Sequence, residues 1–333
     1  MDAGAPSSAP FTTSRRSLLR GAVAVVATAS FAPAAFAQAR PLSVLTTTAM
    51  LGDAARAVGG ARVAVTTLLG EGVDPHVYKP TRADTARMLS ADVIIANGLH
   101  LEAQFKDAFE QIGRTKPVVL AGEALPRDRL LSDEDYKDRF DPHIWMDPDL
   151  WRDVVLVIRD TLKARDPAGA RAYDDAGAAY AAEVAGVADY ARAVLGSVPK
   201  ERRVLVTAHD AFAYFARAFS FEVVGIQGVS TESEAGLRRI EEVVDLVVKR
   251  AIPAVFVEAS VSDRNVLAVV EGAARRGHKL AVGPQLFSDS MGAPGTYEGT
   301  YLGMVDHNVT AIAVALGGKA PAKGRAGRLS LQG

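Results

Sequence analysis

The fold is decided by residues 199–220, which read PKERRVLVTAHDAFAYFARAFS. A charged lead-in is followed by a short β-branched run at residues 204–207, a polar stop and a periodic apolar segment. This order predicts a strand, a tight turn and a helix, with His209 in the turn. His209 would then lie at the carboxyl end of a strand, the edge where open α/β sheets bind ligands. A single histidine in such a turn is more often structural, so the interpretation depends on partners elsewhere in the chain.

The composition is that of an ordinary globular protein. The chain has 333 residues and a formal net charge of -1, with 49% hydrophobic and 23% charged residues. This is enough apolar material for two sizeable cores, and nothing in the balance indicates a nucleic-acid partner. Because the sequence has no cysteine, we expect no disulfide, no thiolate metal ligand and no lipid-modified cysteine near the N-terminus.

Residues 1–37 are predicted to be a cleaved export signal. A basic segment precedes a short alanine-rich apolar region, and the sequence AFA at residues 35–37 is typical of a cleavage site. The pair Arg15 and Arg16 favours the twin-arginine route, although an ordinary Sec signal with two chance arginines stays open. The apolar region is too short for a comfortable membrane span. We therefore expect a soluble periplasmic protein.

The mature chain alternates short β-rich runs with amphipathic segments, which predicts an α/β fold of two lobes, each with a mainly parallel sheet flanked by helices. In the N-terminal lobe, residues 41–167, the predicted strands are 42–48, 63–69, 93–96 and 118–121. In the C-terminal lobe, residues 199–318, they are 204–207, 222–226, 255–258 and 280–283. The predicted helices are 50–58, those starting near 81, 101, 148 and 211, and 234–249, 263–276 and 298–316. Residues 319–333, with glycines, a proline and basic residues, are predicted to be a disordered tail.

The lobes are predicted to be joined by one long rigid helix over residues 168–198. This stretch has no proline, is dense in alanine and carries apolar residues from Tyr173 to Leu195 at helical spacing. About 30 helical residues would span about 45 Å. Two shorter helices broken at Gly177 or Gly186 remain the alternative.

Histidines recur in similar surroundings. The first lobe contains EGVDPHVYKP at residues 71–80, with His76, and FDPHIWMDP at residues 140–148, with His143. Each histidine directly follows Asp-Pro, and two such units in one lobe are hard to attribute to chance. Turn-capping aspartates with bystander histidines stay open as an alternative. In the second lobe, QLFSDSMG at residues 285–292 follows a predicted strand, so Asp289 occupies the same sheet edge as His209.

Three neutral imidazoles and one carboxylate form a complete ligand set for a divalent transition-metal ion. The candidate ligands are therefore His76, His143, His209 and Asp289.

Other polar residues are given lesser roles. We interpret Asp74 and Asp141 as residues that orient their loops rather than bind the ion. Glu258, at the end of its own predicted strand, is either a supporting or a structural residue. We assign no role to the remaining histidines, which are His100, His278 and His307.

Four stretches carry a family resemblance: VDPHVYKP at 73–80, DPHIWMDP at 141–148, TAHDAFAYF at 207–215 and SDSMG at 288–292. In this order and spacing they resemble the metal-binding solute-binding proteins of bacterial zinc and manganese ABC importers, over nearly all of residues 41–316. The resemblance implies two α/β lobes joined by a rigid helix, one ion in the cleft and delivery of that ion to a membrane permease. Carried over by motif, the ligands are His76 and His143 from the first lobe and His209 and Asp289 from the second. We expect a monomer.

Two departures bear on the choice of ion. Zinc-specialised members often have a histidine-rich loop before the second motif, whereas residues 127–140 hold five acidic residues and no histidine. Many manganese-selective members have a glutamate where this chain has His209. We therefore keep Zn²⁺ and Mn²⁺ together as transported ions, with zinc slightly favoured by the nitrogen donors and iron behind.

The leading hypothesis is a receptor without enzymatic activity, and the alternative is a zinc-dependent hydrolase with an interlobe active site. Catalytic zinc usually keeps three protein ligands and an open water position. Four candidate ligands leave little room for a reacting water, and the chain lacks the His-Glu-x-x-His and Gly-x-Ser-x-Gly motifs. Surface adhesion, attached to some relatives, has no supporting feature. We expect binding to weaken as pH falls near the ordinary histidine pKa of about 6.5.

Overall fold

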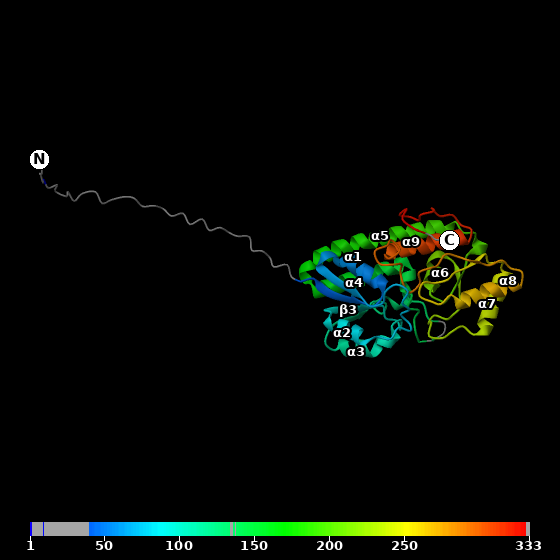
Figure 1. Ribbon diagram of the computed structural model, residues 1–333, viewed down its shortest axis with the longest axis horizontal. Coiled ribbons are helices and arrows are strands. Elements are labelled where there is room, and N and C mark those ends of the chain that lie inside the picture. Colours follow the sequence, from blue (N-terminus) through cyan, green and yellow to red (C-terminus); the bar gives the residue numbers. More distant parts are fainter. Residues whose placement is uncertain (2–8, 10–39, 134–135, 137, 331–333) are drawn as a thin grey trace. The chain divides into compact units, whose positions relative to one another are not determined.

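The computed structural model describes residues 1, 9, 40–133, 136 and 138–330. The predicted export signal lies outside the described residues, apart from two isolated positions. From Arg40 onward the chain forms one compact unit (Figure 1). In the part of the chain that is described, no helix is both long and apolar enough to cross a membrane.

The first half is built on a four-stranded parallel sheet in the order β2-β1-β3-β4. Its strands are β1 (Leu42–Thr46), β2 (Val63–Thr67), β3 (Val93–Ala96) and β4 (Val118–Leu120). Every residue of β3 is buried. Its Val93 and Ile95 join one apolar cluster while Ile94 and Ala96 join another, as expected for a strand covered on both faces.

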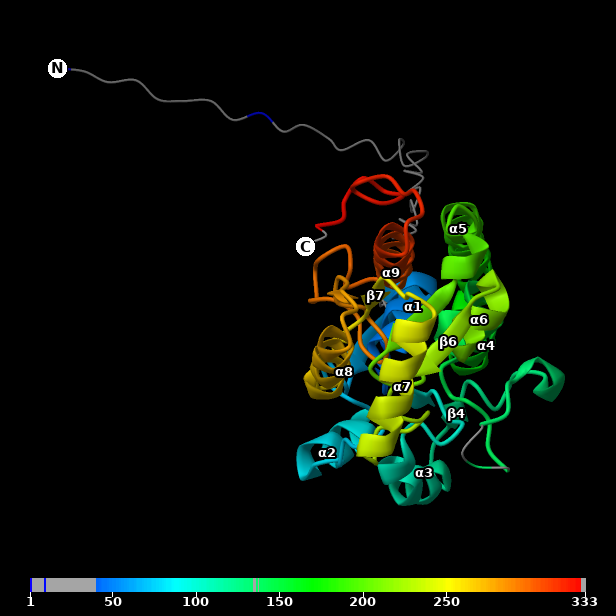
Figure 2. The same cartoon turned by 90° about the vertical axis from the view of Figure 1, so that its right-hand side faces the viewer.

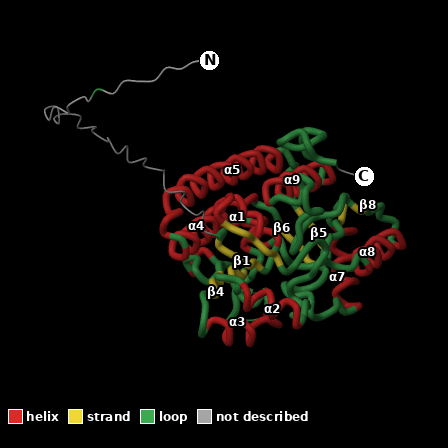
Figure 3. The backbone as a smooth tube through the Cα atoms, turned by 60° about the vertical axis from the view of Figure 1, so that its left-hand side comes forward, coloured by secondary structure: helices red, strands yellow, loops and turns green. Residues whose placement is uncertain are grey.

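Helices cover both faces of this sheet. The first cluster includes residues of α1 (Ala49–Gly59) and α4 (Pro148–Arg165), and the second includes residues of α2 (Arg82–Ser90) and α3 (Lys106–Gly113). Figure 3 shows the two pairs on opposite sides of the strands. Thr81 caps α2 in a capping box with Asp84, and Asp147 caps α4, which begins with a proline.

The second half repeats this plan with shorter strands. Strands β5 (Val204–Thr207) and β6 (Glu222–Gly225) pair in parallel, as do β7 (Ala254–Val255) and β8 (Ala281–Val282), and a parallel bridge between Thr207 and Phe256 joins the two pairs. The helices are α6 (Ala213–Phe219), α7 (Leu237–Lys249), α8 (Arg264–Arg275) and α9 (Tyr301–Ala315). Helices α7 and α8 pack side by side (Figure 2). The α/β class with parallel sheets flanked by helices is thus confirmed.

One long helix, α5 (Ala170–Gly196), has 27 residues and spans about 40 Å. It is continuous through Gly177 and Gly186, and it packs against α1 and α4 of the first half and α9 of the second (Figure 1). Tyr180 of this helix donates a hydrogen bond to Asp53 of α1, which also accepts the backbone N–H of Tyr301 at the start of α9. One carboxylate therefore ties three helices together.

Residues 319–330 differ from the disordered tail that the sequence predicts. Leu329 is only 4% exposed. Asp306, fully buried in α9, accepts hydrogen bonds from the backbone N–H groups of Arg325 and Ala326. The segment is ordered because a buried carboxylate takes up its amide groups, a partner that composition alone does not reveal.

Candidate metal centre

His76 lies in the loop that follows β2. Pro75 restricts the backbone before it, and Asp74 accepts the backbone N–H of His76 at 2.9 Å through Oδ1. The side chain is 4% exposed. The loop therefore presents the imidazole at the carboxyl edge of the first sheet, with one aspartate fixing its main chain.

His143 lies just before α4, in a short turn. Asp141 Oδ1 accepts the imidazole Nδ1–H at 2.7 Å and the backbone N–H of His143 at 2.8 Å. With Nδ1 occupied in this way, Nε2 is the nitrogen left for an ion. Trp145 lies edge-on to the His143 ring and donates its indole N–H to the carbonyl of Ser288 at 2.8 Å. This bond joins the turn that carries His143 to Ser288, the residue before Asp289.

His209 lies in the bend that follows β5, as the sequence predicts for the turn after this strand. Glu258 accepts the backbone N–H of His209 at 2.9 Å through Oε1 and its Nδ1–H at 2.5 Å through Oε2. The side chains of His209 and Glu258 are both buried. Glu258 thus holds His209 as Asp141 holds His143, which favours a supporting role for Glu258 over a purely structural one.

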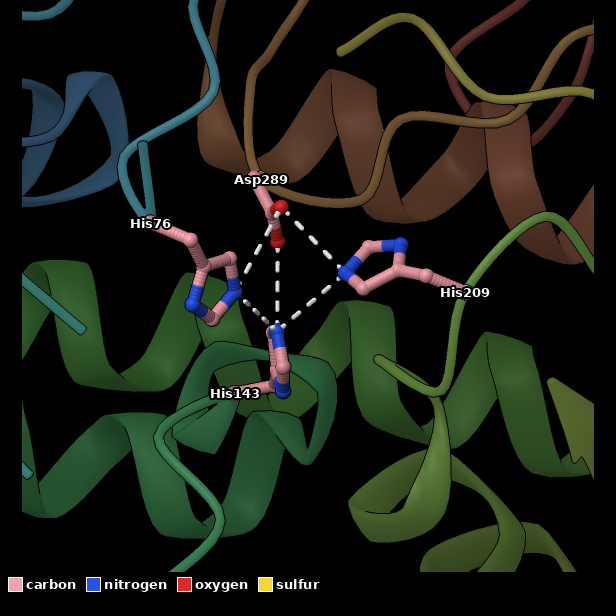
Figure 4. A group of neighbouring side chains, drawn as sticks. All are labelled: His76, His143, His209 and Asp289. Carbon is pink, nitrogen blue, oxygen red and sulfur yellow. Dashed lines mark hydrogen bonds and ion pairs between the residues drawn. The ribbon is translucent and has the colours of Figure 1, made fainter. Parts of the chain in front are cut away.

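The four candidate ligands converge on one point. Figure 4 shows the three Nε2 atoms and the carboxylate of Asp289 turned toward each other. The His143 Nε2 atom lies 3.3 Å from that of His76 and 3.4 Å from that of His209. Asp289 Oδ1 lies 3.3 Å from His143 Nε2, and Oδ2 lies 3.3 Å from His209 Nε2 and 3.9 Å from His76 Nε2.

The separations of 3.3–3.4 Å are those of neighbouring donor atoms around a tetrahedral ion, while His76 lies farther from Asp289, at 3.9 Å. Ligand bonds of about 2.0–2.1 Å around zinc place neighbouring donor atoms about 3.3–3.4 Å apart. One donor atom from each of the four residues lies within 4.8 Å of the others, and all four residues are buried. Both carboxylate oxygens of Asp289 are buried without a hydrogen-bond donor among the described residues. Buried polar atoms without a partner are rare, and an ion at this point would satisfy them.

Burial and charge together shift the pKa values of the cluster. Burial lowers the pKa of His76 to about 3. For His143 burial also favours the neutral ring, but Asp141 and Asp289 outweigh it and raise the pKa to about 9. Glu258 and Asp289 likewise overcome burial and raise the pKa of His209 well above its ordinary value. The metal-free centre therefore carries protons that an ion must displace.

The carboxylate is shifted in the opposite direction. Burial alone would raise the pKa of Asp289, but the adjacent His209 and His143 hold it well below the ordinary value. Asp289 is therefore ionised at neutral pH and can offset part of the charge of a divalent ion.

The structure brings together all four side chains that the sequence singles out, while their assignment as ligands stays a prediction. Asp74 and Asp141 hold their histidines by hydrogen bonds, in line with their predicted orienting role. His278 makes no hydrogen bond to a carboxylate among the described residues. Its Nε2 atom lies 2.7 Å from the Ile252 carbonyl oxygen.

Two further residues near the centre have no sequence signal of their own. His100, given no role from sequence, lines a cavity of about 30 Å³ together with His76. Thr231, from the second half, donates its hydroxyl to Asp74 Oδ2 at 2.6 Å. This pair is separated by 157 positions, so only the fold reveals it.

The chain was compared with known protein families and proteins. The model of the family described as "Zinc-uptake complex component A periplasmic" matches residues 44–315. The chain is 44% identical over 275 residues to the manganese-binding lipoprotein MntA of Bacillus subtilis, covering 83% of this chain and 90% of the relative. It is 42% identical over 282 residues to the zinc-binding protein TroA of Treponema pallidum, covering 85% and 91%.

Solved structures show the same likeness. The periplasmic zinc-binding protein TroA from Treponema pallidum superposes with a TM-score of 0.81 at 41% identity, covering 83% of this chain and 99% of that one. An Fe(III)-bound YtgA structure from Chlamydia trachomatis superposes with a TM-score of 0.76 at 26% identity, covering 84% and 99%. The names of these similar proteins include manganese, zinc and iron.

Proposed function

The chain belongs to the zinc-uptake complex component A family, and we propose that it binds a divalent transition-metal ion between its two halves and delivers the ion to an ABC importer. The proposed ligands are His76, His143, His209 and Asp289. Two relatives at 44% and 42% identity are named as manganese-binding and zinc-binding proteins, which favours these two ions.

One observation carries this proposal. Donor atoms from four loops distant in sequence meet within 4.8 Å of one another, all four residues are buried, and the carboxylate of Asp289 lies 3.3 Å from the Nε2 atoms of His143 and His209. Two of the imidazoles have carboxylates at Nδ1, which fixes their tautomers and raises their basicity as ligands. Side chains arranged in this way suit holding an ion rather than merely packing a core.

A binding role without enzymatic activity is favoured over hydrolysis. A catalytic zinc needs an open coordination position for water and a base beside it. Here four protein side chains surround the centre and all are buried, and the nearby carboxylates Asp141 and Glu258 are already engaged with histidine nitrogens. Hydrolysis of esters, peptides or phosphates by zinc-loaded protein, lost in His209→Ala, would support the hydrolase instead.

The ligand assignment is tested by metal content and affinity. His143→Ala should lower the affinity for Zn²⁺ by at least about 100-fold, since it removes the central donor. His278→Ala is the matched control, because within the described part of the chain its ring hydrogen-bonds to the backbone carbonyl of Ile252 and lies outside the cluster. Calorimetry with each ion, after removal of bound metal, measures the difference. Equal affinities of the two variants would refute the proposed site.

Competition between the ions addresses selectivity. The three nitrogen donors favour zinc, while the two unpartnered oxygens of Asp289 permit bidentate coordination of a larger ion such as manganese. We propose that both ions bind and that Zn²⁺ binds more tightly. Metal analysis of protein isolated from its native compartment, with a Zn²⁺ and Mn²⁺ competition titration, would identify the physiological cargo.

We further propose that the protein acts as a monomer in the periplasm, after export through the signal at residues 1–37, which we assign to the twin-arginine route. The membrane permease of the importer is the proposed receiving partner. Two experiments test the route: replacing Arg15 and Arg16 with Lys should block export in wild-type cells, and the unaltered protein should not be exported in cells that lack the twin-arginine system. Sedimentation of the exported protein tests the monomer.

A further inference from the structure

The three histidines of the centre are not held equally. Asp141 and Glu258 contact both the backbone and the Nδ1 atom of His143 and His209. For His76, the described residues provide only the backbone contact, from Asp74 Oδ1 to the main-chain N–H. The orientation of His76 therefore depends on its loop, and the loop depends on Asp74.

Asp74 is itself held from across the cleft. Its second oxygen, Oδ2, accepts the hydroxyl of Thr231 at 2.6 Å. Thr231 lies in the loop between β6 and α7, residues 226–236, which belongs to the second half. A second bond across the cleft joins Glu232 of this loop to Gln104 at 3.3 Å between exposed side chains. The hydrogen bond between Thr231 and Asp74, two half-buried residues, is therefore the less exposed of these two contacts.

The same loop borders the exposed side of the centre. His76 is 4% exposed, whereas His143 and His209 are fully buried. The cavity of about 30 Å³ beside His76, room for about one water molecule, is lined by Val229, Ser230 and Glu232 of the loop. A shift of this loop would therefore both loosen Asp74 and widen the approach to His76.

We propose that Thr231 is a positioning residue for metal retention, holding the His76 loop through Asp74 so that the ion leaves when this contact opens. The inference rests on the proposed function, since it presupposes an ion at His76. It assigns to one hydroxyl in the second half the task that Asp141 and Glu258 perform at the other two histidines. A bound ion should then dissociate first from His76.

The test is the dissociation rate of Zn²⁺ and, separately, of Mn²⁺, measured by chelator chase. Thr231→Val keeps the side-chain shape and removes the hydroxyl, so dissociation should become about tenfold faster, the effect expected of one hydrogen bond to a charged group. Thr231→Ser should restore the wild-type rate. Thr85→Val is the matched control, because Thr85 is also half-buried but bonds only within its own helix.

A double-mutant cycle separates positioning from general destabilisation. In an Asp74→Ala background, Thr231→Val should change the dissociation rate no further, because its partner is gone. The melting temperature of metal-free Thr231→Val should fall by only a few degrees, the cost of one lost hydrogen bond, so the variant keeps its fold. A wild-type rate in Thr231→Val, or additive effects in the cycle, would overturn the inference while leaving the metal site in place. Failure of the wild-type protein to bind either ion would instead overturn the proposed function and this inference with it.

Discussion

His76, His143 and His209 contribute the same atom to the centre but have different protonation chemistry. The pKa of His143 is raised to about 9 and that of His76 is lowered to about 3. The difference follows from their contacts, because Asp141 accepts a hydrogen bond from the ring of His143, whereas Asp74 contacts the main-chain N–H of His76 and not its ring. An average histidine pKa of about 6.5 therefore describes neither.

The pH dependence of binding follows from this difference. In metal-free protein, His143 is protonated below about pH 9, so an ion must displace a proton there. The affinity for Zn²⁺ should rise by about tenfold per pH unit for each proton displaced between pH 7 and 9. Above the pKa of His143 its contribution should level off. Competition against a chelator of known pH dependence, with calorimetry in two buffers to count protons, measures this.

Asp141→Asn provides the control for the pH profile. It keeps an acceptor near His143 but removes the charge that raises its pKa, so the rise in affinity should shift to lower pH. An affinity that is constant from pH 7 to 9 and falls only near 6.5 would contradict the assignment of the raised pKa to His143. It would agree instead with the expectation drawn from sequence.

At the scale of single residues, the sequence identifies the four side chains that converge in the structure better than it identifies the residues that hold them. Each candidate ligand follows a strand or sits in a turn with a recognisable motif, so local pattern is enough to find it. Asp74 and Asp141 are near their histidines in sequence and were predicted as supports. Thr231 has no such signal, because its contact depends on how the second half folds against the first.

At the scale of elements, helices α5 and α9 differ in the space available beside a glycine. Gly186 lies within α5, where an added Cβ would meet only the terminal nitrogen of the Arg325 side chain, which can move away. Gly303 lies in the first turn of α9, where an added Cβ would collide with the backbone carbonyl oxygen of Tyr297. The same substitution should therefore have opposite effects.

Gly186→Ala should stabilise the protein by up to about 1 kcal/mol, the helix-propensity difference between the two residues. Gly303→Ala should destabilise it by about 1–3 kcal/mol, because backbone must shift. Thermal and urea unfolding of both metal-free variants measures the difference. A destabilised Gly186→Ala would show that the arginine cannot move and that α5 is packed more tightly there than its surroundings indicate.

Helix and strand positions were largely predictable because their periodicity is local. The predicted strand at 204–207 coincides with β5, and that at 93–96 with β3. The predicted strands at 255–258 and 280–283 are each reduced to two residues in β7 and β8. Beyond β7, isolated bridges join Phe256 to Thr207 and Glu258 to Leu286. Glu258 also accepts hydrogen bonds from His209 there.

At the scale of the whole molecule, the two halves share one apolar core. A single cluster contains Val44 and Trp145 of the first half and Leu205 and Phe256 of the second. Helix α5 packs against both halves, and Asp53 links α1, α5 and α9. Opening the halves as rigid bodies would expose this core to water, which is unfavourable in proportion to the apolar area uncovered.

Metal release should therefore involve loops more than whole lobes. Small-angle scattering should give the same radius of gyration, within error, for metal-free and Zn²⁺-loaded protein. Hydrogen exchange should differ mainly in residues 73–79 and 226–236, the loops that carry His76 and Thr231. A large change in the radius of gyration, or altered exchange along α5, would show that a hinge exists despite the shared core.

The order in which the ligands occur along the chain also affects biosynthesis. Two of the candidate ligands precede α5 and two follow it, and the last, Asp289, comes 213 residues after the first, His76. A ribosome must translate this whole span before a nascent polypeptide can trap cargo. The compartment in which the polypeptide completes its folding, and not the one in which translation starts, then determines which cation it meets first.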